Sequence, residues 1–190
     1  MENVLVVSRM HKSLAFLTET LNTAFCDVTT VILSSGTEAR RQFVERNFDL
    51  VIINAPIADE SGESLARFIS AKDGTQVILI VESEIFDEMS SVTENDGILV
   101  VARPFDKNLL WSAFKLAQST QSRLKKIRSE NSKLKQKIED IKIIDRAKWI
   151  LVSNLKFSEQ EAHRFIEKQA MDLRCSRREI AQDILKTYDG

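Results

Sequence analysis

The chain has 190 residues, of which 43% are hydrophobic, and a formal net charge of −1, which is the composition of an ordinary soluble protein with one large or two small domains. Its longest aliphatic run, residues 77–81, is far too short to cross a bilayer, and the N-terminus lacks the layout of a signal peptide, so we expect a cytoplasmic protein without a membrane segment. Cys26 and Cys175 lie far apart in no metal-ligand spacing, and we expect free thiols, no metal and no cofactor.

Residues 1–105 alternate short β-branched runs with amphipathic stretches. This alternation is typical of a parallel sheet with crossover helices. Five strands at this spacing favour a flavodoxin-like order, in which any site lies at the carboxyl ends of the strands. The predicted strands are residues 4–8, 28–33, 50–54, 77–81 and 98–102, and the predicted helices are residues 12–25, 37–46 and 62–71, with a weaker helix near 86–93.

The segment from residue 1 to 106 resembles a response-regulator receiver domain. Residues 49–54 are similar to the third strand of that family, and Arg103-Pro104-Phe105 is similar to the Lys-Pro-Phe motif after its fifth strand. The resemblance implies a pocket in which an aspartate at the end of the third strand is phosphorylated. It also implies a magnesium ion, which an acidic pair after the first strand would hold.

The reacting groups of that pocket are replaced in this chain. Asn54 stands at the phosphorylated position, and an amide forms no acyl phosphate. Ser8 and Arg9 stand at the acidic pair, where a hydroxyl beside a guanidinium disfavours a divalent ion. The other departures are Val81 for the switch hydroxyl, Val100 for the switch aromatic and Arg103 for the lysine. We therefore predict a phosphorylation-dead pseudo-receiver that takes its signal from a regulatory sensor protein or a ligand.

Two other aspartates and two arginines of this segment bear on whether the pocket can be phosphorylated or can bind an anion. Asp49 begins a strand and should lie at the opposite end from the pocket, and Asp59 is expected to be a solvated turn residue. Neither aspartate therefore restores phosphorylation. Arg9 and Arg103 either meet and bind an anion or form surface or intramolecular ion pairs, and we favour the ion pairs.

No proline or glycine interrupts residues 107–154, and helix formers dominate the polar stretch 118–145, which predicts one long helix. Apolar residues follow a heptad repeat there, with Asn131 at a core position that favours a parallel two-stranded pair. We expect a homodimer through this linker, residues 107–142. The alternative is that the helix packs back on its own receiver domain. The predicted seam consists of Leu124, Ile127, Asn131, Leu134, Ile138 and Ile141.

The sequence pattern of residues 143–190 predicts a small three-helix bundle. Ser158 precedes Glu161, and Ser176 precedes Glu179, at the spacing of a capping box that starts a helix. Apolar residues then recur at helical spacing in each of the three stretches. The predicted fold is therefore an α/β flavodoxin-like receiver domain with a five-stranded parallel sheet, followed by a long coiled-coil helix and this bundle.

The C-terminal segment resembles the ANTAR RNA-binding domain. Its residues 145–148, 158–162, 170–172 and 179–181 fall in the order and spacing of that family's three short helices. The resemblance implies that the chain binds paired stem-loops in a nascent leader RNA and so prevents a transcription terminator from forming. It would then be a regulator and not an enzyme.

The charge distribution agrees with a nucleic-acid partner for the C-terminal half. Residues 1–107 contain 9 Lys/Arg and 17 Asp/Glu, a net of −8, whereas residues 108–190 contain 18 and 11, a net of +7. A basic half attracts polyanions, although a solvated helical surface explains the charges equally well. Arginine binds phosphate bidentately and stacks on bases, and lysine acts as a mobile point charge. The first candidate RNA contacts are Lys148, which the resemblance implies, and Arg146. The further candidates are Arg174, Arg177, Arg178, Lys168 and Arg164.

Three residues of this segment depart from the family pattern. Trp149 stands where the family often has glycine, and it is expected in the core in preference to stacking on a loop base. Glu167 stands where an arginine is expected, although Lys168 adjoins it. His163 occupies a position that is often aromatic, and without a second His, Cys or carboxylate cluster nearby it is not expected to bind metal.

Two other functions stay open. A DNA-binding regulator would use residues 176–185 as a recognition helix, but the glycine-bearing turn usual before such a helix is missing. A scaffold would use the basic bundle to bind protein only. An RNA-binding protein with several phosphate contacts should lose affinity steeply as salt rises, whereas a scaffold should show no salt-dependent RNA binding.

Overall fold

The computed structural model describes residues 1–72 and 74–188, apart from the side chains of residues 11 and 12. It divides into two compact units, residues 1–126 and residues 127–190, each with its own core. The domain limits expected from the sequence, 1–106, 107–142 and 143–190, remain predictions, and residues 189 and 190 of the last lie outside the described part. Within that part, no helix is both long and apolar enough to span a membrane.

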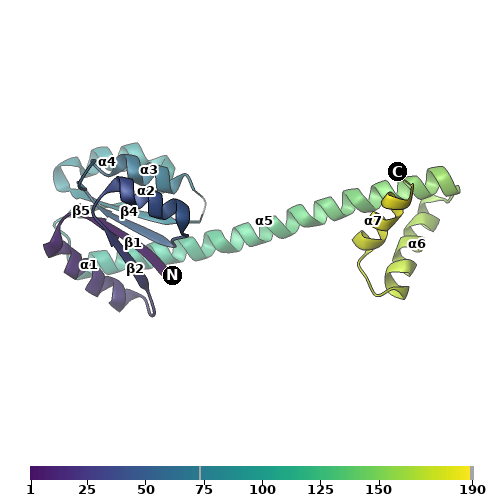
Figure 1. Ribbon diagram of the computed structural model, residues 1–190, viewed down its shortest axis with the longest axis horizontal. Coiled ribbons are helices and arrows are strands. Elements are labelled where there is room, and N and C mark those ends of the chain that lie inside the picture. Colours follow the sequence, from purple (N-terminus) through teal and green to yellow (C-terminus); the bar gives the residue numbers. More distant parts are fainter. Residues whose placement is uncertain (73, 189–190) are drawn as a thin grey trace. The chain divides into compact units, whose positions relative to one another are not determined.

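The first unit contains one parallel sheet whose strands lie in the order β2-β1-β3-β4-β5 (Figure 1). The predicted flavodoxin-like order is confirmed. The middle strands are buried on both faces, which is why their sequences are nearly continuous Val, Ile and Leu. The strands are β1 (Asn3–Ser8), β2 (Thr29–Leu33), β3 (Leu50–Asn54), β4 (Gln76–Glu82) and β5 (Leu99–Arg103).

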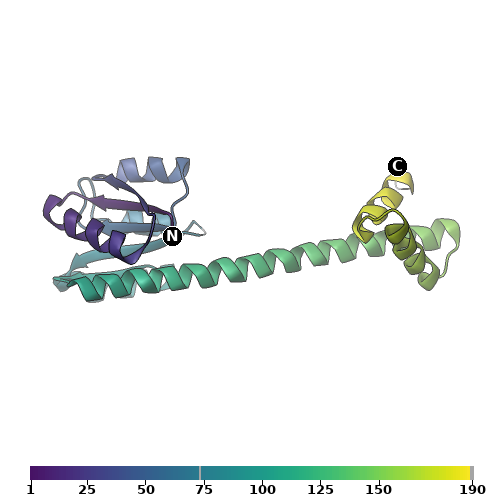
Figure 2. The same ribbon diagram turned by 90° about the horizontal axis from the view of Figure 1, so that it is seen from below.

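Helices cover both faces of this sheet (Figures 1 and 2). Because side chains alternate along a strand, Leu5 and Val7 face one core and Val4 and Val6 face the other. The first core is completed by α2 (Gly36–Glu45), α3 (Glu63–Ser70) and α4 (Phe86–Thr93). The short 3-10 turns η1 (Ser83–Ile85) and η2 (Glu94–Asp96) lie beside α4. The second core is completed by α1 (His11–Ala24) and the first turns of α5 (Lys107–Leu155).

Asp59 has a structural role that differs from a simple solvated turn. It is exposed, as expected, but its carboxylate accepts hydrogen bonds from the backbone N–H groups of Gly36 and Thr37, at 2.6 and 3.0 Å, and from the Thr37 hydroxyl at 2.9 Å. These bonds satisfy amides in the first turn of α2 that have no partner within the helix. They also lower the pKa of Asp59 to about 2.

α5 is a continuous helix of 49 residues, so the predicted long helix is confirmed. Leu110, Ala113, Phe114 and Ala117 are buried against the sheet. The apolar residues of the predicted seam expose from 36% to 58% of their surface, and Asn131 is exposed as well. The seam residues are therefore exposed in the single chain, and the homodimer through them remains a prediction.

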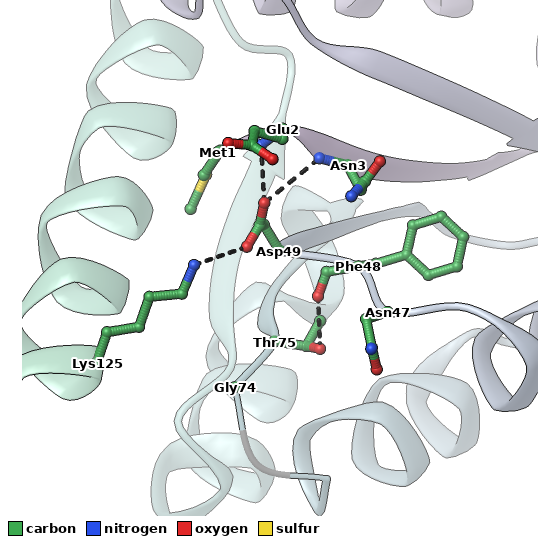
Figure 3. Close-up of a pocket in the computed structure, with 9 residues that line it drawn as sticks. All are labelled: Met1, Glu2, Asn3, Asn47, Phe48, Asp49, Gly74, Thr75 and Lys125. Atoms are coloured by element: carbon green, nitrogen blue, oxygen red, sulfur yellow. Dashed lines mark hydrogen bonds and ion pairs between the residues drawn. The ribbon is translucent and has the colours of Figure 1, made fainter. Parts of the chain in front are cut away.

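Asp49 attaches α5 to the end of the sheet where the strands begin, beside a hollow of about 360 Å³ (Figure 3). One carboxylate oxygen accepts from the N–H groups of Glu2 and Asn3, at 2.7 and 3.3 Å. The other accepts from Gln121 Nε2 at 2.8 Å and from Lys125 Nζ at 3.0 Å. Burial alone would raise the pKa of Asp49, but these bonds together outweigh it and hold that pKa well below its ordinary value.

The second unit is built from the end of α5 with α6 (Glu159–Asp172) and α7 (Arg177–Tyr188), as Figure 2 shows. Both predicted capping pairs are present. Ser158 Oγ accepts from the Glu161 N–H at 3.3 Å while Glu161 accepts from the Ser158 N–H at 2.8 Å, and Ser176 and Glu179 repeat the exchange at 3.2 and 2.7 Å. The core between the helices contains Ala147, Ile150, Leu151, Ala162, Ile166, Ala170, Ile180, Ala181 and Ile184.

Candidate functional site

The pocket at the carboxyl end of the sheet is closed by its own hydrogen bonds. Ser8 and Asn54 are register partners at the ends of β1 and β3. The fully buried Asn54 amide donates to the Ser8 hydroxyl and to the Ser13 hydroxyl of α1, both at 3.0 Å. A hydrogen-bond donor therefore stands at the end of β3, where the receiver resemblance places a carboxylate.

Arg103 extends from the end of β5 over this pocket. Its guanidinium lies 3.0 Å from Glu82 Oε1, donates to the Ala55 carbonyl, and places Nη1 at 3.1 Å from Met10 Sδ. Only 13% of its side chain is exposed. The ion-pair interpretation of Arg103 is thus the one that the structure supports, whereas Arg9 is exposed in the loop after β1.

Three of the six predicted pocket residues, Ser8, Asn54 and Arg103, lie together at this end of the sheet. Ser8, Asn54 and Arg103 take part in the contacts above, and Val81 is buried. Among the described residues, Asn54 Oδ1 and Arg103 Nε are buried side-chain atoms without a hydrogen-bond partner. Leaving one such group unpaired costs about 1–3 kcal/mol, so both atoms are unfavourably buried at this end of the sheet.

Lys148, the first predicted RNA contact, lies between two carboxylates in the second unit. Its Nζ is 2.8 Å from Asp145 Oδ1 in the preceding turn of α5 and 3.7 Å from Glu159 Oε1 at the start of α6. The hydrogen bond to Asp145 outweighs the opposing effect of burial and raises the pKa of Lys148. With 18% of its side chain exposed, Lys148 is a fixed cation and not a mobile one.

Two adjoining hollows run between α5 and α6. They share Lys148 and Glu159, and we call them together the α5–α6 groove. The hollow of about 350 Å³ is lined by Asp145, Lys148, Trp149, Val152 and Glu159, and the hollow of about 230 Å³ by Lys148, Glu159, Gln160, His163 and Arg164.

The expectation that Trp149 packs in the core is wrong, because 69% of its surface is exposed. The core face of α5 is occupied by Ala147, Ile150 and Leu151. Position 149 lies off that face in a helix of 3.6 residues per turn, and its side chain borders the α5–α6 groove.

The remaining predicted RNA contacts have different surroundings. Arg164 lines the groove with Lys148. Arg177 is paired with Glu167 of α6 at 3.0 Å, and Arg178 is paired with Asp140 of α5 at 2.6 Å, where it joins α7 to α5. The other three, Arg146, Lys168 and Arg174, are exposed.

Comparison with known proteins places the second unit in a family. Residues 132–185 match the ANTAR domain. The transcriptional regulatory protein PdtaR of Mycobacterium tuberculosis is 24% identical over 139 residues, which are 73% of this chain and 68% of that protein. The aliphatic amidase regulator of Pseudomonas aeruginosa is 25% identical over 136 residues, which are 71% of this chain and 69% of that protein.

Solved structures share the fold of the first unit. The signal receiver domain of an HD domain-containing protein from Pseudomonas fluorescens Pf-5 has a TM-score of 0.57 at 23% identity and covers 66% of this chain and 92% of its own. A response regulator receiver domain protein from Clostridium thermocellum has a TM-score of 0.57 at 21% identity and covers 65% of this chain and 99% of its own.

The first unit therefore has the receiver fold. The C-terminal domain of this chain is an ANTAR domain. The chain thus combines a receiver fold in its first unit with an ANTAR domain in its second.

Proposed function

We propose that this chain is an RNA-binding transcription antiterminator that binds paired stem-loops in nascent leader RNA and acts in the cytoplasm. The observation that carries the proposal is the ANTAR match over residues 132–185. The net charge of +7 over residues 108–190 supports it, because phosphate contacts dominate the affinity of proteins for nucleic acids. The relatives named as a transcriptional regulatory protein and an amidase regulator agree with a regulatory role.

The receiver-fold unit is proposed to act without phosphorylation. Magnesium prefers anionic oxygen ligands, but Ser8 and Asn54 bond to each other and Arg103 brings a fixed cation to the same end of the sheet. These residues do not fit a magnesium ion, and the Asn54 amide is no phosphoacceptor. A regulatory partner or ligand would then act by binding one arrangement of the protein better than another.

The chain is further proposed to be a homodimer through the seam from Leu124 to Ile141. Its apolar residues are exposed in the single chain, and a second copy would bury them. Asn131 would pair with its counterpart across the seam and fix the register. Two copies provide two ANTAR domains, which suits an RNA with two stem-loops.

A binding titration at two salt concentrations tests the proposal. Leader RNA with two adjacent stem-loops is compared with one-loop RNA and with matched duplex DNA. We expect preference for the two-loop RNA and a steep loss of affinity as salt rises. Equal binding to duplex DNA would favour a DNA-binding regulator, and no RNA binding would favour a protein scaffold.

A further inference from the structure

Trp149 is the most exposed large aromatic side chain of the second unit. Single exposed apolar residues are common on protein surfaces, so exposure alone identifies no site. Here the indole also borders the hollow of about 350 Å³ in the α5–α6 groove, beside two carboxylates and a lysine. An aromatic face next to convergent polar groups is the usual composition of a site for a planar polar ligand.

The charges of the α5–α6 groove favour a neutral ligand over a phosphate. Lys148 and Arg164 contribute two positive charges, and Asp145 and Glu159 contribute two negative ones. Lys148 already bonds Asp145 at 2.8 Å. A phosphate entering this groove would therefore meet two carboxylates, which oppose the attraction of the two cations.

A nucleobase matches these groups better. Single-stranded RNA loops present unstacked bases that stack on aromatic side chains and form hydrogen bonds through their edges. A carboxylate accepts from an exocyclic amino group, which adenine, cytosine and guanine carry and uracil lacks. A lysine donates to a ring nitrogen or carbonyl oxygen of the same base.

We propose that the α5–α6 groove binds one unpaired nucleobase with an exocyclic amino group, stacked on Trp149, whose amino group donates to Asp145 or Glu159. This inference rests on the proposed RNA-binding function and names the part of the RNA that enters the groove. Lys148 then orients the carboxylates and the base edge, and phosphate contacts fall to basic residues outside the groove, such as Lys168 and Arg174.

The chain offers a clean optical test because it contains only two tryptophans. The other one, Trp111, lies on α5 in the first unit and is 43% exposed. In the full-length Trp111→Phe variant, Trp149 is the sole indole, and stacking of a base on it quenches its fluorescence. The probes are two hairpin RNAs that share one stem, one with adenines and cytosines in the loop and one with uridines only. Binding is measured independently by the anisotropy of labelled RNA.

We expect saturable quenching of Trp149 by the amino-bearing loop, with the same midpoint as the anisotropy curve. The amino-bearing loop should bind Trp149→Ala on the order of tenfold more weakly, since stacking of one base commonly contributes a factor of this size. The uridine loop should bind the unchanged groove weaker by a similar factor, roughly tenfold, since it has no amino group to donate to the carboxylates. Trp149→Phe should retain most of the affinity because it keeps an aromatic face. Trp111→Phe alone should bind as the original chain does, and circular dichroism should show the same helix content in every variant.

Three outcomes would overturn the inference. Anisotropy that reports RNA binding while Trp149 fluorescence stays unchanged would remove the base from the groove and leave the proposed function standing. Equal affinity for the uridine loop would remove the recognition of the amino group. Absence of binding to any hairpin RNA would overturn the proposed function and this inference together.

Discussion

Replacing Asp49 with alanine is expected to destabilise the receiver-fold unit by about 3 kcal/mol. Each hydrogen bond to a charged group contributes roughly 1.5–3 kcal/mol. The short bonds from the Glu2 N–H and from Gln121 are both lost, although Gln121 keeps the Asp49 carbonyl as an acceptor at 3.2 Å. Lys125 adds little, because 62% of its side chain is exposed and such ion pairs contribute at most about 1 kcal/mol.

Urea unfolding in a Trp149→Phe background measures this effect, because Trp111 then reports on the first unit alone. Lys125→Ala is the matched control, and it should cost less than about 1 kcal/mol. A loss below about 1 kcal/mol in Asp49→Ala as well would refute the idea that this carboxylate holds α5 to the sheet.

The pH dependence of unfolding provides a second readout of Asp49. Its folded pKa is depressed, so its contribution to stability is complete above the unfolded pKa of about 3.9 and is lost as the pH falls below that value. The unfolding free energy of Asp49→Ala should therefore fall less steeply between about pH 5 and pH 2 than that of the original chain. Parallel curves for the two proteins would contradict the assigned pKa direction.

Four further predictions concern other parts of the chain. Asp59→Ala should lower the urea midpoint of unfolding at pH 7 and make that midpoint less dependent on pH in acid. The reason is that a carboxylate with a pKa of about 2 stabilises the start of α2 above about pH 4 and loses that effect toward pH 2. An unchanged acid profile would argue against the hydrogen bonds of Asp59 to the first turn of α2. Neither the original chain nor Asn54→Asp should gain a phosphoryl group from acetyl phosphate with magnesium, as mass spectrometry would show, because Ser8 and Arg9 leave the metal without its acidic pair; modification of the original chain would end the pseudo-receiver proposal. Lys148→Ala should weaken RNA binding roughly tenfold while helicity and dimerisation stay intact, and unchanged affinity in the anisotropy titration would remove Lys148 from the site. Asn131→Ile should raise dimer stability and loosen the oligomeric state in sedimentation experiments, whereas a monomer before and after the change would contradict the coiled coil.

Most of the fold could be predicted from local sequence patterns. The β-branched runs place all five strands to within a residue or two, and the capping boxes at Ser158 and Ser176 fix the starts of the last two helices. These features depend on neighbouring residues, which a sequence shows directly. Asn54 at the end of β3, on which the proposed pseudo-receiver depends, was readable for the same reason, because it is a matter of residue identity.

Contacts between distant residues could not be predicted in this way. The pairs Asp49–Lys125 and Asp140–Arg178 join residues 76 and 38 positions apart, and their formation depends on how α5 packs in each unit. The exposure of Trp149, in contrast, could have been predicted from the sequence. Ala147, Ile150 and Leu151 already define the core face of α5, and helical periodicity leaves position 149 outside it.

The continuity of α5 limits how this protein can be divided. Leu110 and Phe114 belong to the core of one unit, and Ile150 and Leu151 belong to the core of the other, on the same unbroken helix. No loop marks a natural cut between them. A fragment that preserves the first unit has to extend through Lys125, and one that preserves the second has to begin no later than Asp140. Fusions that exchange either unit between proteins therefore have to join two chains inside a helix and keep the helical periodicity across the junction.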